Sequence, residues 1–171
     1  IDKSAATLKM EDAPGMQVAV YPLRPRSTGT VRITSADPAA LPLSTLDFFA
    51  DAQDRRTMVG AVRYVRDLMS RAPLADAVVG EVRPGAALDD EAAILDAYRT
   101  MGTTAYHAAG TCRMGTDAAS VVDPQTRVRG VDGLHVVDLS IFPEIPAGNT
   151  FAPVMAIAWR AAALIAALDT P

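Results

Sequence analysis

Residues 145–165 read IPAGNTFAPVMAIAWRAAALI, and this stretch predicts the last element of the fold. After Asn149 and Thr150, apolar residues recur every three to four positions, which predicts a helix that buries one face. Pro153 fits the first turn of this helix, where a missing N–H is harmless. Arg160 and many alanines interrupt the apolar run, so we expect a buried helix rather than a membrane span. The apolar face holds Val154, Ile157, Ala161, Leu164 and Leu168.

Upstream of this helix, residues 121–140 read VVDPQTRVRGVDGLHVVDLS. Two apolar runs flank Asp132 and Gly133, a pair typical of a tight turn, so we expect strand, turn and strand. Pro143 and Pro146 should hold the stretch between this hairpin and the last helix open as a loop.

The first half of the chain shows strand patterns followed by helix patterns. Residues 16–23 and 29–38 are predicted strands, the second with a period of two, and residues 39–49 an irregular connection. A helix is expected from Gln53 to Met69, with Met58, Val62, Val65 and Met69 on its apolar face. Another should begin after Asp89 as N-cap and end at Gly102, with an apolar face of Ile94, Leu95, Tyr98 and Met101.

Composition excludes several classes of protein. Half of the 171 residues are hydrophobic and 21% are charged, enough for a core and against disorder. The net charge of −4, with no basic stripe carrying interleaved aromatics, argues against nucleic-acid binding. Cys112 is the single cysteine, so neither an internal disulfide nor a zinc or redox cysteine pair is expected. The chain shows no secretory pattern at its start, and cytoplasmic residence is the default expectation.

His107 is the first candidate for chemistry. It precedes a turn of small residues that includes Gly110 and Thr111, and such a turn can lie against a ligand. Most isolated histidines are packing residues, and that interpretation stays open here. The other histidine, His135, lies inside a predicted strand, and we interpret it as structural.

Asn149, Thr150 and Asp138 each have a structural and a functional interpretation. Asn149 and Thr150 stand where the last helix begins, so either can be a plain N-cap. The same helix N-terminus carries unpaired N–H groups and partial positive charge, which also suit a bound anionic group. Asp138 ends an apolar run and can cap the next turn or contact a sugar hydroxyl of a cofactor.

Taken together, YHAAGTCRMG (106–115), VVDPQTRVRGVDGLHVVDLSIFP (121–143) and residues 145–165 resemble the C-terminal part of the glucose–methanol–choline (GMC) oxidoreductases. The resemblance begins at YPLRPRSTGTVRITSADP (21–38), which is similar to the substrate-domain sheet of that family. Two positions depart from the common pattern: Leu139 stands where a smaller residue is frequent, and Trp159 where many members carry Glu.

The resemblance implies FAD as hydride acceptor and small-molecule alcohols as substrates. His107 falls on the family's catalytic base, and Asn149 on a second catalytic position that members fill with His or Asn. Asp138 and Leu139 fall where the chain passes the ribityl and pyrophosphate portion of the flavin. The backbone N–H groups of Asn149 and Thr150 fall beside the pyrimidine side of the ring.

The resemblance also implies an α+β fold divided in two. Residues 1–105 would form part of a substrate-binding domain, an antiparallel sheet backed by helices. Residues 106–171 would supply the active-site loop and the C-terminal strands and helix that complete an FAD-binding domain. The N-terminal FAD-binding half of the same protein, with its Gly-rich strand–turn–helix, would be the partner of this chain as a separate or missing segment. Two alternatives remain: a hydroxynitrile-lyase-type relative without net redox, and an inert fragment without its FAD-binding half.

Overall fold

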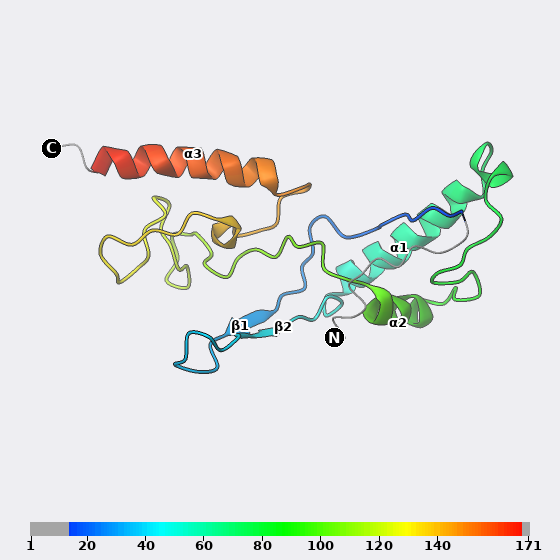
Figure 1. Ribbon diagram of the computed structural model, residues 1–171, viewed down its shortest axis with the longest axis horizontal. Coiled ribbons are helices and arrows are strands. Elements are labelled where there is room, and N and C mark those ends of the chain that lie inside the picture. Colours follow the sequence, from blue (N-terminus) through cyan, green and yellow to red (C-terminus); the bar gives the residue numbers. More distant parts are fainter. Residues whose placement is uncertain (1–13, 169–171) are drawn as a thin grey trace.

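The computed structural model describes residues 14–168. Figure 1 shows α1 and α2 at one end of the molecule, the β1–β2 pair beneath the middle, and α3 at the opposite end above an irregular stretch. In chain order the elements are β1 (Thr30–Arg32), β2 (Leu43–Thr45), α1 (Ala52–Met69), the 3₁₀ helix η2 (Leu74–Asp76), α2 (Glu91–Met101), the 3₁₀ helix η3 (Leu139–Ile141) and α3 (Phe151–Leu168).

Helix α1 forms within one residue of its predicted start. Asp51 is the N-cap, and its carboxylate accepts a hydrogen bond of 2.6 Å from the Gln53 amide. Met58 and Val62 of the predicted apolar face are buried, while Val65 and Met69 are half-buried toward the end of the helix. Periodicity therefore predicted both the element and its packed face.

Helix α2 begins one residue later than predicted. Asp90, not Asp89, is the N-cap, because its carboxylate accepts a 2.9 Å hydrogen bond from the Ala93 amide. Ile94 and Leu95 are buried as expected. Met101 is 51% exposed, against the prediction, because it is the last residue of the helix and lies beyond the packed turns.

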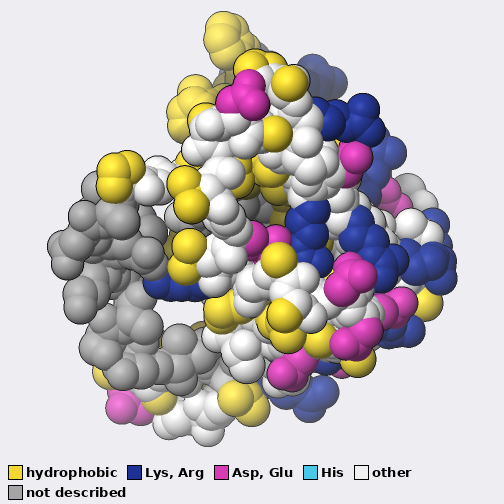
Figure 2. Space-filling model, turned by 90° about the vertical axis from the view of Figure 1, so that its right-hand side faces the viewer, with side chains coloured by type: hydrophobic (Ala, Val, Ile, Leu, Met, Phe, Trp, Pro, Cys, Tyr) yellow, Lys and Arg dark blue, Asp and Glu magenta, His cyan; other side chains and the backbone are white. Residues whose placement is uncertain are grey.

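Helices α1 and α2 pack together to form a small core. Its buried members are Phe49, Met58, Val59, Val62, Ile94 and Leu95, and Val20 and Tyr98 pack against them. The Arg99 guanidinium also lies 5.6 Å from the centre of the Phe49 ring. On the face shown in Figure 2, basic and acidic side chains intermingle with apolar ones. Within α1 and just after it, Asp67 and Arg71 form an exposed ion pair at 2.8 Å.

The predicted sheet is much smaller than expected. Strands β1 and β2 pair antiparallel over three residues each, with Val31 opposite Ser44. Every position of both strands is exposed, so among residues 14–168 no helix backs this sheet, against the prediction. β2 also lies inside residues 39–49, which were predicted to be irregular. The residue directly before β1 is Gly29, and a Cβ at this position would collide with the Thr45 carbonyl oxygen.

The predicted strand at 16–23 is wrong. These residues have no regular secondary structure. A strand needs a neighbour for its backbone N–H and C=O groups, and within residues 14–168 the β1–β2 pair is the one sheet. The alternating apolar pattern alone could not supply that neighbour.

Asp54 of α1 holds the segment that precedes β1. It is 1% exposed, and its carboxylate accepts hydrogen bonds from the Arg26 amide at 3.0 Å and the Ser27 amide at 2.7 Å. The Ser27 hydroxyl donates to the same carboxylate and accepts from the Asp51 amide at 3.1 Å. One buried charge therefore joins the start of α1 to a chain segment 27 residues earlier.

Replacing Asp54 with alanine should lower the free energy of unfolding by about 2–4 kcal/mol, since each buried donor left without an acceptor costs about 1–3 kcal/mol. Urea or thermal unfolding measures the loss. Asp47→Ala, at an exposed position in the same region, is the control and should unfold like the parent. Equal stability of the two variants would contradict the anchoring role.

Because the Asp54 carboxyl titrates, the stability that Asp54→Ala removes should depend on pH. Burial by itself raises the pKa of Asp54, but hydrogen bonds from the Ser27 hydroxyl and from the Arg26 and Ser27 amides outweigh it, so the pKa lies below its ordinary 3.8. A folded pKa below the unfolded one means that the stabilisation is present above pH 3.8 and is lost as the pH falls through the folded value. The difference between parent and Asp54→Ala should therefore shrink in acid.

Residues 121–140 pair as predicted but form no regular strands. Arg127 and His135 make an isolated antiparallel bridge, and the Val128 amide donates to the Leu134 carbonyl at 2.9 Å. Gly133 in the turn has φ +71°, a value suited to glycine. The Asp123 carboxylate accepts from the amides of residues 125 and 127, which folds the first arm into a turn instead of a ladder.

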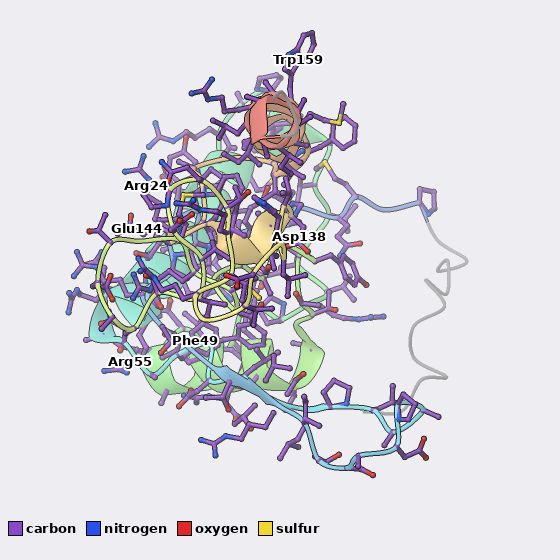
Figure 3. The ribbon with its side chains drawn as sticks, turned by 90° about the vertical axis from the view of Figure 1, so that its left-hand side faces the viewer. Arg24, Phe49, Arg55, Asp138, Glu144 and Trp159 are labelled. Atoms are coloured by element: carbon purple, nitrogen blue, oxygen red, sulfur yellow. The ribbon has the colours of Figure 1, made fainter. Side chains whose placement is uncertain are left out.

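Helix α3 places Pro153 in its first turn and packs the predicted face. Ala161 is buried, and Val154, Ile157 and Leu164 are half-buried; the side chain of Leu168 lies outside the described residues. Figure 3 looks along this helix and shows Trp159 pointing away from the rest of the chain.

The division of the chain into two parts at residue 105 stays a prediction.

Candidate active site

His107 follows α2 after a short extended stretch. Gly102 ends the helix, and the Tyr106 amide donates to the Thr104 hydroxyl at 3.0 Å. Tyr106 has φ +61°, a left-handed conformation that is uncommon for a residue with a bulky side chain. The chain therefore turns sharply just before His107, whose side chain is half-buried.

The turn after His107 is fastened to η3. The Cys112 amide donates to the Ser140 carbonyl at 3.0 Å, and the Met114 amide donates to the Ile141 carbonyl at 2.8 Å. Gly110 in this turn has φ +90°, a backbone conformation that favours glycine. Two backbone hydrogen bonds thus bring residues 107–115 beside the segment that leads to α3.

Thr150, at the start of α3, contacts His107 directly. Its Oγ1 lies 2.9 Å from Nδ1 of His107, across 43 residues of sequence. Thr150 is 7% exposed, and its carbonyl accepts the first hydrogen bond of α3, from the Val154 amide at 3.0 Å. Asn149, the preceding residue, is exposed. The loop of His107 and the N-terminus of α3 therefore meet at one place.

An open hollow of about 450 Å³ lies at this meeting point. Of the predicted site residues, the structure brings His107, Leu139, Asn149 and Thr150 to its wall. Three residues that sequence reasoning did not single out complete the lining: Tyr106, Phe151 and Val154. The sequence signal that could have identified them is their position, since each lies within four residues of a predicted site residue. Their apolar surfaces leave few polar groups to orient a ligand.

Asp138 does not line the hollow. Its carboxylate is exposed and accepts hydrogen bonds from the amide of Ser140, at 2.8 Å, and from the hydroxyl of the same residue. This caps the start of η3, the structural role considered for it. Asp138 thereby orders the segment to which the His107 turn is fastened, and a contact with a cofactor sugar stays a prediction.

His135 and Cys112 have no place at the hollow. His135 Nδ1 lies 3.0 Å from the hydroxyl of Thr126, a buried residue. Cys112 is a half-buried free thiol. Over residues 14–168, no group of three or more His, Cys, Asp or Glu side chains could hold a metal ion. Over the same range, no helix has the length and apolarity required to cross a bilayer.

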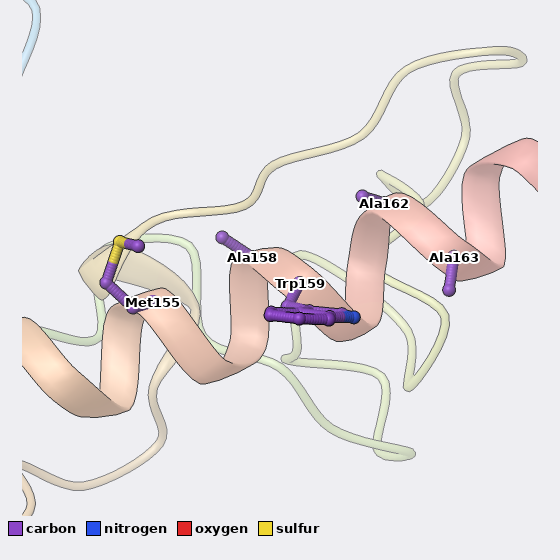
Figure 4. A pocket seen from close by; sticks show the side chains of 5 residues that line it. All are labelled: Met155, Ala158, Trp159, Ala162 and Ala163. Atoms are coloured by element: carbon purple, nitrogen blue, oxygen red, sulfur yellow. The ribbon is translucent and has the colours of Figure 1, made fainter.

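A larger hollow, of about 520 Å³, lies on the outer face of α3, and its lining residues include no ionisable side chain. Figure 4 shows its lining of Met155, Trp159 and three alanines. The hollow beside His107 differs because it joins an imidazole, a primary amide and the amide end of an 18-residue helix. An imidazole can accept a proton, and the amide can donate a hydrogen bond to an oxygen that gains charge.

The sequence pattern of the GMC oxidoreductase family matches residues 25–158. The alcohol dehydrogenase (acceptor) of Pseudomonas putida is 38% identical over 151 residues, which are 88% of this chain and 27% of that protein. An oxygen-dependent choline dehydrogenase of Photobacterium profundum is 36% identical over 153 residues, again 88% of this chain and 27% of that protein. The chain thus spans about a quarter of the length of these relatives.

Solved structures agree with this comparison. Pyridoxine 4-oxidase from Mesorbium loti matches with a TM-score of 0.77 at 33% identity, over 82% of this chain and 28% of that one. A formate oxidase of Aspergillus oryzae, studied for modification of its FAD, matches with a TM-score of 0.75 at 31% identity, over 82% of this chain and 25% of that one. The family pattern and the shared fold lead to one conclusion: the chain belongs to the GMC oxidoreductase family and corresponds to its C-terminal part.

Proposed function

We propose that this chain carries the catalytic side chains of an FAD-dependent oxidoreductase that acts on small-molecule alcohols. The observation that carries the proposal is the meeting of His107 with the start of α3 at one hollow, through the 2.9 Å contact to Thr150. The alcohol and choline dehydrogenases among its relatives support alcohols as the substrate class.

The residues present fit a flavin at this place. The amides of Thr150, Phe151 and Ala152 precede the first hydrogen bond of α3, which Val154 donates. Such amides, together with the helix dipole, favour negative charge. They would face the pyrimidine side of FAD, with Asp138 and Leu139 near its ribityl and pyrophosphate portion. When bound, FAD supplies the acceptor for the hydride that leaves the alcohol carbon.

In this proposal the side chains of the chain itself transfer the hydroxyl proton and stabilise the oxygen that it leaves. His107 accepts the proton of the alcohol hydroxyl as the carbon–hydrogen bond breaks. Asn149 donates a hydrogen bond to the same oxygen, which takes on alkoxide character. Tyr106, Phe151 and Val154 line the same open hollow, and an FAD-binding half that covered it would exclude water and strengthen such a hydrogen bond.

We further propose that an FAD-binding half covers much of this chain. The chain exposes 13005 Å² of surface, whereas a compact protein of 18.0 kDa exposes about 8,000 Å². Part of the excess is apolar, including Trp159, which is 83% exposed on the outer face of α3. Exposed apolar surface of this kind fits an interaction with a partner.

A flavin spectrum tests the proposed function. The chain combined with an FAD-binding half should show bound flavin, and an alcohol added without oxygen should bleach it; the chain by itself should show little flavin. The control is the same preparation without alcohol. A bound flavin that no alcohol reduces, while a cyanohydrin is cleaved, would instead indicate a lyase without net redox. The failure of both reactions would contradict an active site at this hollow.

A further inference from the structure

Both histidines of the sequence have the same type of partner. Nδ1 of His107 lies 2.9 Å from the hydroxyl of Thr150, and Nδ1 of His135 lies 3.0 Å from the hydroxyl of Thr126. Both threonines are buried, at 7% and 1% exposed. Only the first pair lies at the hollow, so the second provides an internal comparison.

The hydroxyl of Thr150 is available for this contact because of where α3 begins. A threonine just before a helix usually accepts a hydrogen bond from the amide two or three residues further on. The third residue here is Pro153, which has no N–H. Among the described residues, the side-chain hydrogen bond of Thr150 runs to His107 instead. The backbone carbonyl of Thr150 still starts the helix, independently of the side chain.

This contact decides which ring nitrogen can act. Nδ1 is paired with a buried hydroxyl, so Nε2, on the opposite edge of the ring, is the nitrogen left for the hollow. A neutral imidazole has one N–H and one lone pair. If Nε2 is to accept a proton, the N–H must be on Nδ1, and it then needs an acceptor. The hydroxyl oxygen of Thr150 is that acceptor.

We propose that Thr150 is a positioning residue that holds His107 in the tautomer with the proton on Nδ1 and the lone pair on Nε2. The inference rests on the proposed role of His107 as the base. The Nδ1–H donates to Thr150 Oγ1 both before and after Nε2 accepts the substrate proton. The ring therefore keeps one orientation through the reaction, and a neutral hydroxyl adds no charge to the site.

Histidine ring NMR tests the tautomer directly. The protein, combined with its FAD-binding half and labelled with ¹⁵N-histidine, is compared as parent, Thr150→Val, Thr150→Ser and Thr126→Val. The two histidine signals of this chain are assigned from His107→Ala and His135→Ala. We expect the proton of neutral His107 on Nδ1 in the parent and in Thr150→Ser, and a mixture of tautomers in Thr150→Val. Thr126→Val should alter the His135 signals alone.

Turnover should follow the same order. Thr150→Val should lower kcat by about 10–100-fold, by analogy with the loss of a partner that orients a metal-binding histidine. Its flavin spectrum and KM should stay close to those of the parent, whereas Thr150→Ser should recover most of kcat. Thr126→Val removes an equivalent hydrogen bond elsewhere and should keep the parent's kcat. Should Thr150→Val fail to fold, Thr150→Ala removes the same hydroxyl and carries the same readouts.

The outcomes separate this inference from the proposed function. An unchanged His107 tautomer in Thr150→Val, or parental kcat in that variant, would overturn the positioning role even if His107→Ala is inactive. A Thr150→Ser variant as impaired as Thr150→Val would also overturn it, since a hydroxyl would then not suffice. An active His107→Ala variant would remove the proposed function, while the NMR comparison would still report the Thr150 contact.

Discussion

His107→Ala should lower kcat for alcohol oxidation by about 10²–10⁴-fold, the usual contribution of a general base. The variant should still bind FAD, because the backbone amides at the start of α3 do not depend on the imidazole. Stopped-flow reduction of the bound flavin by an alcohol, under anaerobic conditions, measures the step to which His107 contributes.

His135→Ala is the matched control for this experiment. It removes the other imidazole, which pairs with Thr126 and does not line the hollow. We expect its reduction rate to equal that of the parent. Near-parental reduction of a flavin-loaded His107→Ala variant would contradict the assignment of His107 as the base.

Asn149→Ala should lower kcat by about 10²–10³-fold, as the loss of one hydrogen-bond donor to a developing oxyanion does in other enzymes. The substrate oxygen gains charge only as its proton leaves, so the effect should be larger on kcat than on KM. Steady-state kinetics with one alcohol measures both constants.

Asn149→His supplies the comparison for that variant. The resemblance to the GMC family implies that either Asn or His serves at this position, so the histidine variant should recover part of the activity. The double variant His107→Ala/Asn149→Ala should lose less than the product of the two single losses, because both groups act on one oxygen. A change in KM alone would contradict the role of Asn149.

Helices were more predictable from this sequence than strands. The apolar spacing of α1, with Met58 and Val62, and of α3, with Ala161, gave both elements and their packed faces, because a helix satisfies its own backbone. Residues 16–23 were predicted to form a strand but do not, since a strand depends on a neighbour elsewhere in the chain. The ends of α2 were predicted less well: the N-cap is Asp90 rather than Asp89, and Met101, at the last position, is exposed rather than buried.

The resemblance gave candidate site residues, whose roles stay predictions, but it did not give the contacts between them. The motif resemblance selected His107, Leu139, Asn149 and Thr150, and these residues line one hollow. The contact between His107 and the Thr150 side chain joins positions 43 residues apart, and no local pattern gives it. Pro153 held a partial clue, since it removes a donor that would otherwise compete for the hydroxyl.

The backbone hydrogen bonds from Cys112 and Met114 to residues 140 and 141 form a junction beside the site. Residues 116–138 leave this junction and return to it, and their exposed tip at 130–133 lies in a glycine-containing turn. Closing a somewhat longer loop costs little entropy. Evolution can therefore lengthen or shorten the exposed tip at 130–133, and so change what it contacts outside, without changing the register between the imidazole and the last helix.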